Sequence, residues 1–181
     1  EGMKQLIGLN RPAAIEKFPQ LFPGCPESGE ACLQRYRAWM DDYIRENGVP
    51  VKPGLRELLA WLKQAHILCA VATSTFTNVA IGYLKNAGVL NCFAAIVGGD
   101  QVTKSKPDPE IFQLAMRALG KQTPETCLVF EDSRNGLLAG ANGGFPGIVV
   151  PDLFDPTLEL PGLCYARCAR LDEAIDVIQN S

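Results

Sequence analysis

Histidine is almost absent from this sequence, because His66 is the only one among 181 residues. A zinc site with two histidine ligands and a phosphotransfer site with two histidines are therefore excluded. A Ser-His-Asp triad would have to use His66, which lies between a helical pattern and an apolar run. We interpret His66 as a structural residue.

Basic runs and long apolar runs are missing as well. The formal net charge is −3 and no segment combines basic with aromatic residues, so we expect no nucleic-acid partner. No apolar stretch approaches the ~20 residues that span a bilayer, and residues 1–18 show no signal-peptide pattern. We therefore expect no membrane partner.

Paired cysteine motifs are also lacking, although seven cysteines are present. Their number is odd, their spacing is irregular and no Cys-x-x-Cys occurs. Such cysteines are typical of reduced, small apolar residues in a cytosolic protein, with a metal site as a minor alternative. We therefore expect a cytoplasmic location.

The sequence does contain an α/β pattern. Helical spacing over residues 12–22 and 28–47 is followed by a linker rich in proline and glycine at 47–54. Helical patterns and apolar runs then alternate, which predicts a parallel sheet with helices on both faces. The predicted helices are 54–66, 78–88, 108–120, 136–144 and 171–179, and the predicted strands are 67–73, 93–99, 126–130 and 147–151.

The helix predicted at 28–47 has an apolar face. Apolar residues recur at i, i+4, i+7, i+8, i+11 and i+12, which is one side of a helix with 3.6 residues per turn. We interpret this face as the core of the N-terminal helical region. Its members are Cys32, Tyr36, Trp39, Met40, Tyr43 and Ile44.

Polar residues follow three of the predicted strands. Thr73 and Ser74 come after the first, Lys104 and Lys106 after the second, and the adjacent acids Glu131 and Asp132 after the third. In open parallel sheets, ligands bind beyond the carboxyl ends of the strands, so these side chains should share one rim. Hydroxyls at a helix N-terminus suit a phosphate, a lysine suits developing negative charge, and paired carboxylates suit Mg²⁺.

These segments resemble motifs II, III and IV of the haloacid dehalogenase-like superfamily. They read VATST at 71–75, KSKPDPEIF at 104–112 and VFEDSRNGLLAGANGG at 129–144. The likeness is to the phosphatase and β-phosphoglucomutase branch and covers nearly the whole chain. It implies a Rossmann-like core, here part of it at 51–181, and part of a small helical cap at 1–50.

The resemblance also implies roles for individual residues. Thr73, Ser74 and Lys106 would bind the phosphate of a small phosphorylated metabolite, with Thr73 and Lys106 taking part in catalysis. Glu131 and Asp132 would hold Mg²⁺. We interpret Lys104 as a surface residue. The implied reaction is hydrolysis of a sugar phosphate-like monoester, or alternatively a phosphomutase reaction.

One family feature is missing from the sequence. Family members carry motif I, a strand ending Asp-x-Asp-Gly, whose first Asp attacks phosphorus. No Asp-x-Asp occurs in these 181 residues. Because that strand lies between the strands of motifs II and IV, we expect no ordinary five-stranded sheet and no activity from this chain alone. Further residues upstream, strand re-pairing or another chain would have to fill the gap.

Two alternatives remain open. The segment Cys164–Arg170 fits the Cys-x₅-Arg spacing of a cysteine phosphatase loop, in which a thiolate attacks phosphate. However, it contains no glycine that would allow a tight cradle. The other alternative is a protein that binds phosphate and Mg²⁺ without turnover.

Overall fold

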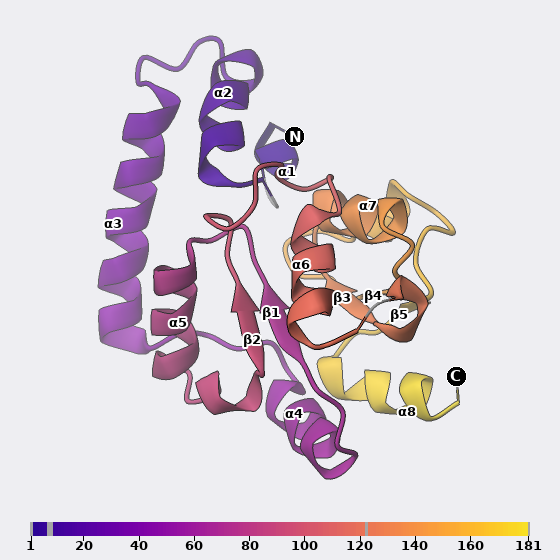
Figure 1. Ribbon diagram of the computed structural model, residues 1–181. Helices are drawn as coiled ribbons and strands as arrows, with labels where there is room; N and C mark the ends of the chain where they lie inside the picture. Colours follow the sequence, from indigo (N-terminus) through magenta and orange to yellow (C-terminus); the bar gives the residue numbers. More distant parts are fainter. Residues whose placement is uncertain (1, 7–8, 122, 181) are drawn as a thin grey trace.

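The N-terminal part of the computed structural model, which describes residues 2–6, 9–121 and 123–180, is helical. It consists of α1 (Gly2–Leu6), α2 (Arg11–Leu21) and α3 (Gly29–Asn47). The starts of α2 and α3 are capped by side chains, because Asn10 accepts a hydrogen bond from the Ala13 N–H at 3.1 Å and Ser28 accepts one from the Ala31 N–H at 3.2 Å. In Figure 1, α2 and α3 run side by side at one end of the molecule.

Helices and strands alternate from residue 55 up to β4, as the sequence predicted, and β5 then follows β4 without an α-helix between them. The strands are shorter than predicted, and the short strand β5 and helix α1 had no sequence signal that we recognised. The elements are α4 (Leu55–Gln64), β1 (Ala70–Ala72), α5 (Thr77–Asn86), β2 (Ala95–Val97), α6 (Glu110–Ala118), β3 (Val129–Glu131), α7 (Arg134–Asn142), β4 (Gly147–Val149), β5 (Ala166–Arg167) and α8 (Ala174–Gln179).

The strands are parallel, which confirms the α/β fold class, but they form two separate sheets. One sheet has the order β1–β2 and the other β3–β4–β5. No strand joins β1 to β3 within the described ranges. The described strands therefore do not form one five-stranded sheet. This agrees with the expectation drawn from the missing motif I strand.

The facing edges of β1 and β3 are identified by their hydrogen bonds. The Thr73 N–H donates to the Val97 carbonyl, and the Val150 N–H donates to the Glu131 carbonyl. Backbone N–H and C=O groups alternate in direction along a strand. The backbone groups of Ala72 therefore point away from β2, and those of Phe130 point away from β4. Those two edges carry no neighbouring strand in the part of the chain that the structure describes.

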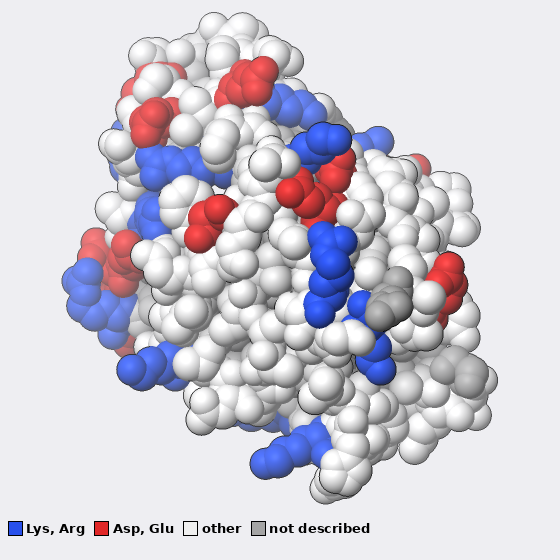
Figure 2. Space-filling view, viewed as in Figure 1, with Lys and Arg blue, Asp and Glu red and all other residues white. Residues whose placement is uncertain are grey.

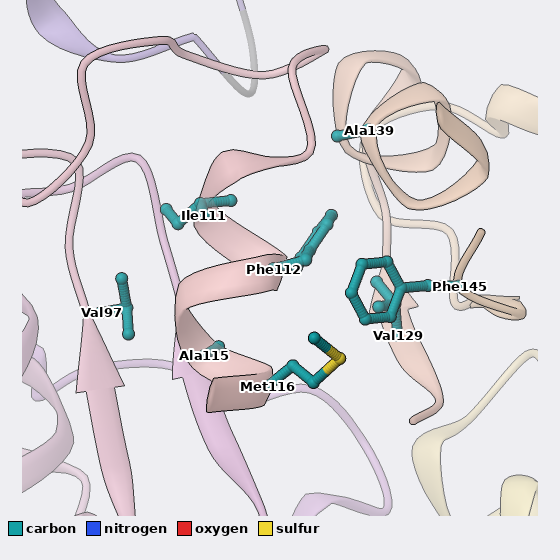
Figure 3. Close-up of a cluster of buried hydrophobic side chains, with 8 residues drawn as sticks. All are labelled: Val97, Ile111, Phe112, Ala115, Met116, Val129, Ala139 and Phe145. Atoms are coloured by element: carbon teal, nitrogen blue, oxygen red, sulfur yellow. The ribbon is translucent and has the colours of Figure 1, made fainter. Parts of the chain in front are cut away.

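Two apolar clusters cover opposite faces of the strands. Val129 of β3 belongs to the first cluster, whereas Leu128 and Phe130 on either side of it pack against the second. The first cluster joins α6, β2, β3 and α7, so apolar packing connects the two sheets (Figure 3). The second joins α4 and α8 to β4. Helices therefore cover both faces, as predicted.

The prediction for the apolar face of α3 is wrong for its aromatic residues. Tyr36 and Trp39 are each 59% exposed and Tyr43 is 40% exposed. Their rings contact one another, with centroids 6.3 and 5.7 Å apart. Helical spacing determines which residues share a face, but the elements packed around the helix decide whether that face is covered.

Two other expectations concern the whole chain. None of the helices in the described ranges is long and apolar enough to cross a membrane. The cytoplasmic location and the division into 1–50 and 51–181 stay predictions.

Leu137 tests the core between α7 and β4. It is 2% exposed, so Leu137→Ala removes buried methyl groups and leaves a cavity. We expect a loss of about 2–5 kcal/mol in the free energy of unfolding, measured by urea denaturation. The control is Leu158→Ala, because Leu158 is 83% exposed and should contribute less than about 0.5 kcal/mol. Equal losses in both variants would contradict the assigned core.

Candidate functional site

Lys106 is the central side chain of the candidate site. It follows β2 in the chain, and its side chain is only 6% exposed. Its ammonium forms an ion pair with the carboxylate of Glu131 at the end of β3, and it also donates to the Ala72 carbonyl of β1 at 3.4 Å. The lysine thus contacts both facing strands at their carboxyl ends, where the sequence placed the rim.

The environment of Lys106 holds its ammonium in place. The Nζ atom lies 4.7 Å from the centroid of the Phe112 ring, a distance that allows a cation–π interaction. Phe112 belongs to α6 and contacts Phe145 edge-on, with ring centroids 6.0 Å apart. A buried charge is costly unless it is paired, and here Glu131 supplies the pair.

Glu131 is held by the turn that starts α7. Its carboxylate accepts hydrogen bonds from the Ser133 hydroxyl at 3.0 Å and from the backbone N–H of Asp132 at 3.3 Å. The Ser133 hydroxyl oxygen in turn caps α7 by accepting from the Gly136 N–H at 3.0 Å. A Cβ atom at Gly136 would lie 2.0 Å from the carboxyl carbon of Glu131, so only glycine fits there.

Asp132 is more open than Glu131, with its side chain 38% exposed. Burial raises its pKa above the usual range, the neighbouring charge of Glu131 adds to the increase, and the ammonium of Lys52 opposes it. Burial and the negative charge of Glu131 therefore outweigh the positive charge of Lys52 at the Asp132 carboxylate. The sequence analysis gave no role to Lys52, which lies between two prolines in the linker.

The chemistry of this carboxylate pair fits Mg²⁺. Mg²⁺ takes oxygen ligands and commonly uses only one or two carboxylates, with water and phosphate oxygens completing its shell. Glu131 is engaged by Lys106, which leaves Asp132 as the more available ligand. Across the described residues there is no group of three or more His, Cys, Asp or Glu side chains that could hold a metal alone.

Thr73 directly follows Ala72, whose carbonyl contacts Lys106. Its hydroxyl oxygen accepts a hydrogen bond from the Thr75 N–H at 3.2 Å, within the turn before α5. The residue at the N-cap of α5 is Phe76, so Thr73 does not cap that helix. The Ser74 carbonyl packs closely on Gly99, where a Cβ atom would come within 2.4 Å of it. Phosphate binding by Thr73 and Ser74 stays a prediction.

Two other sequence interpretations can be compared with the structure. Lys104 is 73% exposed and lies 3.6 Å from Asp108, which agrees with a surface role. The cysteine phosphatase alternative is wrong, because β5 runs through the segment Cys164–Arg170 and leaves no cradle loop. The Arg170 guanidinium also forms hydrogen bonds to Asp172 at 3.0 and 3.2 Å.

The surface charges are mixed on the face shown in Figure 2. Lysine and arginine side chains lie among acidic ones, and they form no continuous basic area on this face. Charge on this face therefore gives no support for a nucleic-acid surface.

Comparisons with known proteins agree with the resemblance seen in the motifs. A model of the haloacid dehalogenase-like hydrolases matches residues 2–144. The phosphorylated carbohydrates phosphatase of Thermotoga maritima is 41% identical over 107 residues, which are 59% of this chain and 47% of that protein. The chain thus spans about half the length of the curated relatives it matches.

Solved structures show the same fold. CbbY from Rhodobacter sphaeroides, in complex with phosphate, has a TM-score of 0.76 at 25% identity and is matched over 95% of this chain and 78% of its own. A putative β-phosphoglucomutase from Thermotoga maritima has a TM-score of 0.71 at 27% identity, over 98% of this chain and 82% of its own. These matches confirm the Rossmann-like fold class.

Gly136→Ala tests the close approach of α7 to Glu131. The added methyl group would overlap the carboxylate, so we expect a loss of roughly 1–3 kcal/mol in the free energy of unfolding. The matched control in the same helix is Gly140→Ala, whose Cβ would have its nearest neighbour at 3.8 Å. That change should be neutral or stabilising by up to about 1 kcal/mol. Two equally tolerated variants would contradict the described packing.

Asp132→Asn tests how much the charge of Asp132 lowers the stability of the folded protein. Because the pKa of Asp132 is raised in the folded state, its charge lowers stability at pH values above that pKa. In metal-free buffer, the Asn variant should therefore be more stable than the wild type at pH 7. The difference should disappear as the pH falls below the ordinary aspartate value of about 3.9.

Urea denaturation at several pH values measures this effect. The control is Asp42→Asn, which removes an exposed ion pair with Arg45 at 2.7 Å and should change the stability by less than about 1 kcal/mol, without the gain expected for Asp132→Asn. A less stable Asp132→Asn protein at pH 7 would show that attraction to Lys52 outweighs burial and the charge of Glu131.

Proposed function

Because the chain belongs to the haloacid dehalogenase-like hydrolases, we propose that the rim around Lys106 is the phosphoryl-transfer site of a Mg²⁺-dependent enzyme acting on small phosphomonoesters. The observation that carries this proposal is the position of Lys106. Its buried ammonium contacts the carboxyl ends of both β1 and β3, through the Ala72 carbonyl and the carboxylate of Glu131, and Asp132 directly follows Glu131 in the chain. A fixed cation at this rim is suited to a reaction that builds negative charge on phosphate.

Each rim residue has a distinct part in this proposal. The hydroxyl groups of Thr73 and Ser74 would bind the phosphoryl oxygens. Lys106 would neutralise the charge that develops on the transferring group. Asp132 and Glu131 would hold Mg²⁺, which when bound would neutralise phosphate charge and help to orient the group.

The nucleophile would come from a strand seated between β1 and β3. An aspartate at the carboxyl end of such a strand would lie at the level of Ala72 and Glu131, beside the Lys106 ammonium. Its carboxylate oxygen would form a bond to phosphorus while the ester oxygen leaves and takes up a proton. Water would then cleave the aspartyl-phosphate and release inorganic phosphate. Among the described residues, no strand lies on the edges of β1 and β3 that point away from β2 and β4, and this supports this part of the proposal.

Phosphorylated carbohydrates are the substrate class that the relatives suggest. The Thermotoga relative is named as a phosphatase of phosphorylated carbohydrates, and the second structural neighbour is a putative β-phosphoglucomutase. A small sugar phosphate would present one phosphate to the rim and its hydroxyl groups to the adjacent helical region. The same arrangement would serve a phosphomutase if a sugar hydroxyl rather than water accepted the phosphoryl group.

The test compares the chain with and without a candidate strand. The 181-residue chain alone should release no phosphate from sugar phosphates in the presence of Mg²⁺. The same chain extended or supplied with an apolar peptide ending in Asp-x-Asp should release phosphate, measured by a colorimetric phosphate assay. A peptide ending in Asn-x-Asp should not support release, and Lys106→Met should lower the rate of the complemented protein by about 10²–10³-fold.

The outcomes separate the alternatives. Rapid Mg²⁺-dependent release by the chain alone would contradict the external nucleophile. No release by the complemented protein, together with an increase in melting temperature on adding phosphate and Mg²⁺, would favour the non-catalytic binding protein.

A further inference from the structure

Lys52 connects the linker between α3 and α4 to the candidate metal site. Its ammonium nitrogen lies 3.6 Å from a carboxylate oxygen of Asp132 and 3.3 Å from one of Asp152. It also donates to the backbone carbonyls of Val150 at 3.2 Å and Pro151 at 3.4 Å. One ammonium therefore lies within 3.6 Å of four oxygen atoms, one from the segment after β3 and three from the segment after β4.

This set of oxygens is chemically that of a cation site. Two carboxylates and two carbonyls are the groups that hard cations select in proteins. An ammonium group has only three N–H donors, so it cannot satisfy all four oxygens fully at once. A divalent cation bound at Asp132 would therefore compete with the Lys52 ammonium for the Asp132 carboxylate.

The backbone near Lys52 is fixed to the core. The Leu171 N–H donates to the Pro53 carbonyl at 3.0 Å, and the Leu55 N–H donates to the Lys52 carbonyl at 3.2 Å. Gly54 has φ 81°, and a Cβ atom there would come within 2.0 Å of the Asp172 carboxylate. The Lys52 side chain, which is 28% exposed, can therefore leave Asp132 by rotating about its own bonds without moving the linker.

The charges of the neighbours explain why Asp132 needs this partner. Lys106 is occupied by Glu131, and the negative charges of Glu131 and Asp152 both act on Asp132. Lys52 is the cation that opposes them. Asp152, at 60% exposure, can remain its partner when Asp132 is taken by another cation.

We propose that Lys52 is a resident counter-cation of the metal site, which pairs with Asp132 when no metal is bound and competes with the divalent cation for that carboxylate. This inference rests on the proposed metal site at Asp132. Removing the charge of Lys52 should therefore strengthen metal binding, whereas a residue that merely supports the site would weaken binding when removed. The coupling is reciprocal, so bound metal weakens the contact between Lys52 and Asp132.

Mn²⁺ binding to the full chain tests the proposal. Isothermal titration calorimetry at pH 7 would compare wild type with Lys52→Met, Lys52→Gln and Lys52→Arg. We expect the two uncharged variants to bind Mn²⁺ tighter by on the order of tenfold, within the range of typical coupling between sites. Lys52→Arg keeps the charge and should stay within about twofold of the wild type. Circular dichroism would verify that each variant is folded, and the two uncharged variants provide independent readings.

Two controls define the site. Lys104→Met removes an exposed lysine outside the proposed site, one that lies 3.6 Å from Asp108, and should leave the Mn²⁺ affinity unchanged. Asp132→Asn should abolish the binding. If wild type binds Mn²⁺ and the uncharged Lys52 variants bind equally or more weakly, the competition is overturned while the metal site stands. If no variant binds Mn²⁺, the metal site of the proposed function fails, and the role of Lys52 fails with it.

Discussion

The buried ion pair between Lys106 and Glu131 is the interaction on which the site depends. It joins the loop after β2 to the end of β3, and the same ammonium reaches the backbone of β1. A pair of this kind holds both partners in place, because loss of either leaves an uncompensated buried charge at a cost of about 3–5 kcal/mol. The apolar cluster around α6 includes Phe112, whose ring lies beside the Lys106 ammonium, and it connects the same two sheets. The contacts that position Lys106 therefore also help to hold the two sheets together.

The two carboxylates of the rim, Glu131 and Asp132, differ in how well their charges are compensated. Glu131 has a lysine, a hydroxyl and backbone N–H groups as partners, whereas Asp132 is held beside another carboxylate with partial burial. Such an uneven pair is typical of functional sites, where a residue is kept ready for a ligand at some cost in stability. Lys52 reduces that cost in the absence of a metal. Its place in the linker also joins the helical N-terminal region to the chemistry at the rim.

The separation of the two sheets relates the fold to the proposed reaction. The edges of β1 and β3 face each other without an intervening strand in the described residues, and both end at Lys106. A strand seated there would satisfy backbone groups of both edges and deliver its last side chains to the phosphate site. The relatives extend well beyond the region they share with this chain. A single strand would therefore complete both the sheet and the proposed active site.

The sequence by itself determined the alternation of helices and strands and the parallel pairing of the strands. It also predicted the site residues Thr73, Ser74, Lys106, Glu131 and Asp132. These features depend on local periodicity, on polar residues in the segments after strands and, for the choice of Lys106 over Lys104, on the family resemblance, so they can be inferred without knowing which segments pack together. Only the tertiary structure decided that Lys106 pairs with Glu131, that Lys52 reaches Asp132 across 80 positions of the chain, and that Trp39 is exposed. These outcomes depend on which distant segments meet, and neither spacing nor composition contains that information.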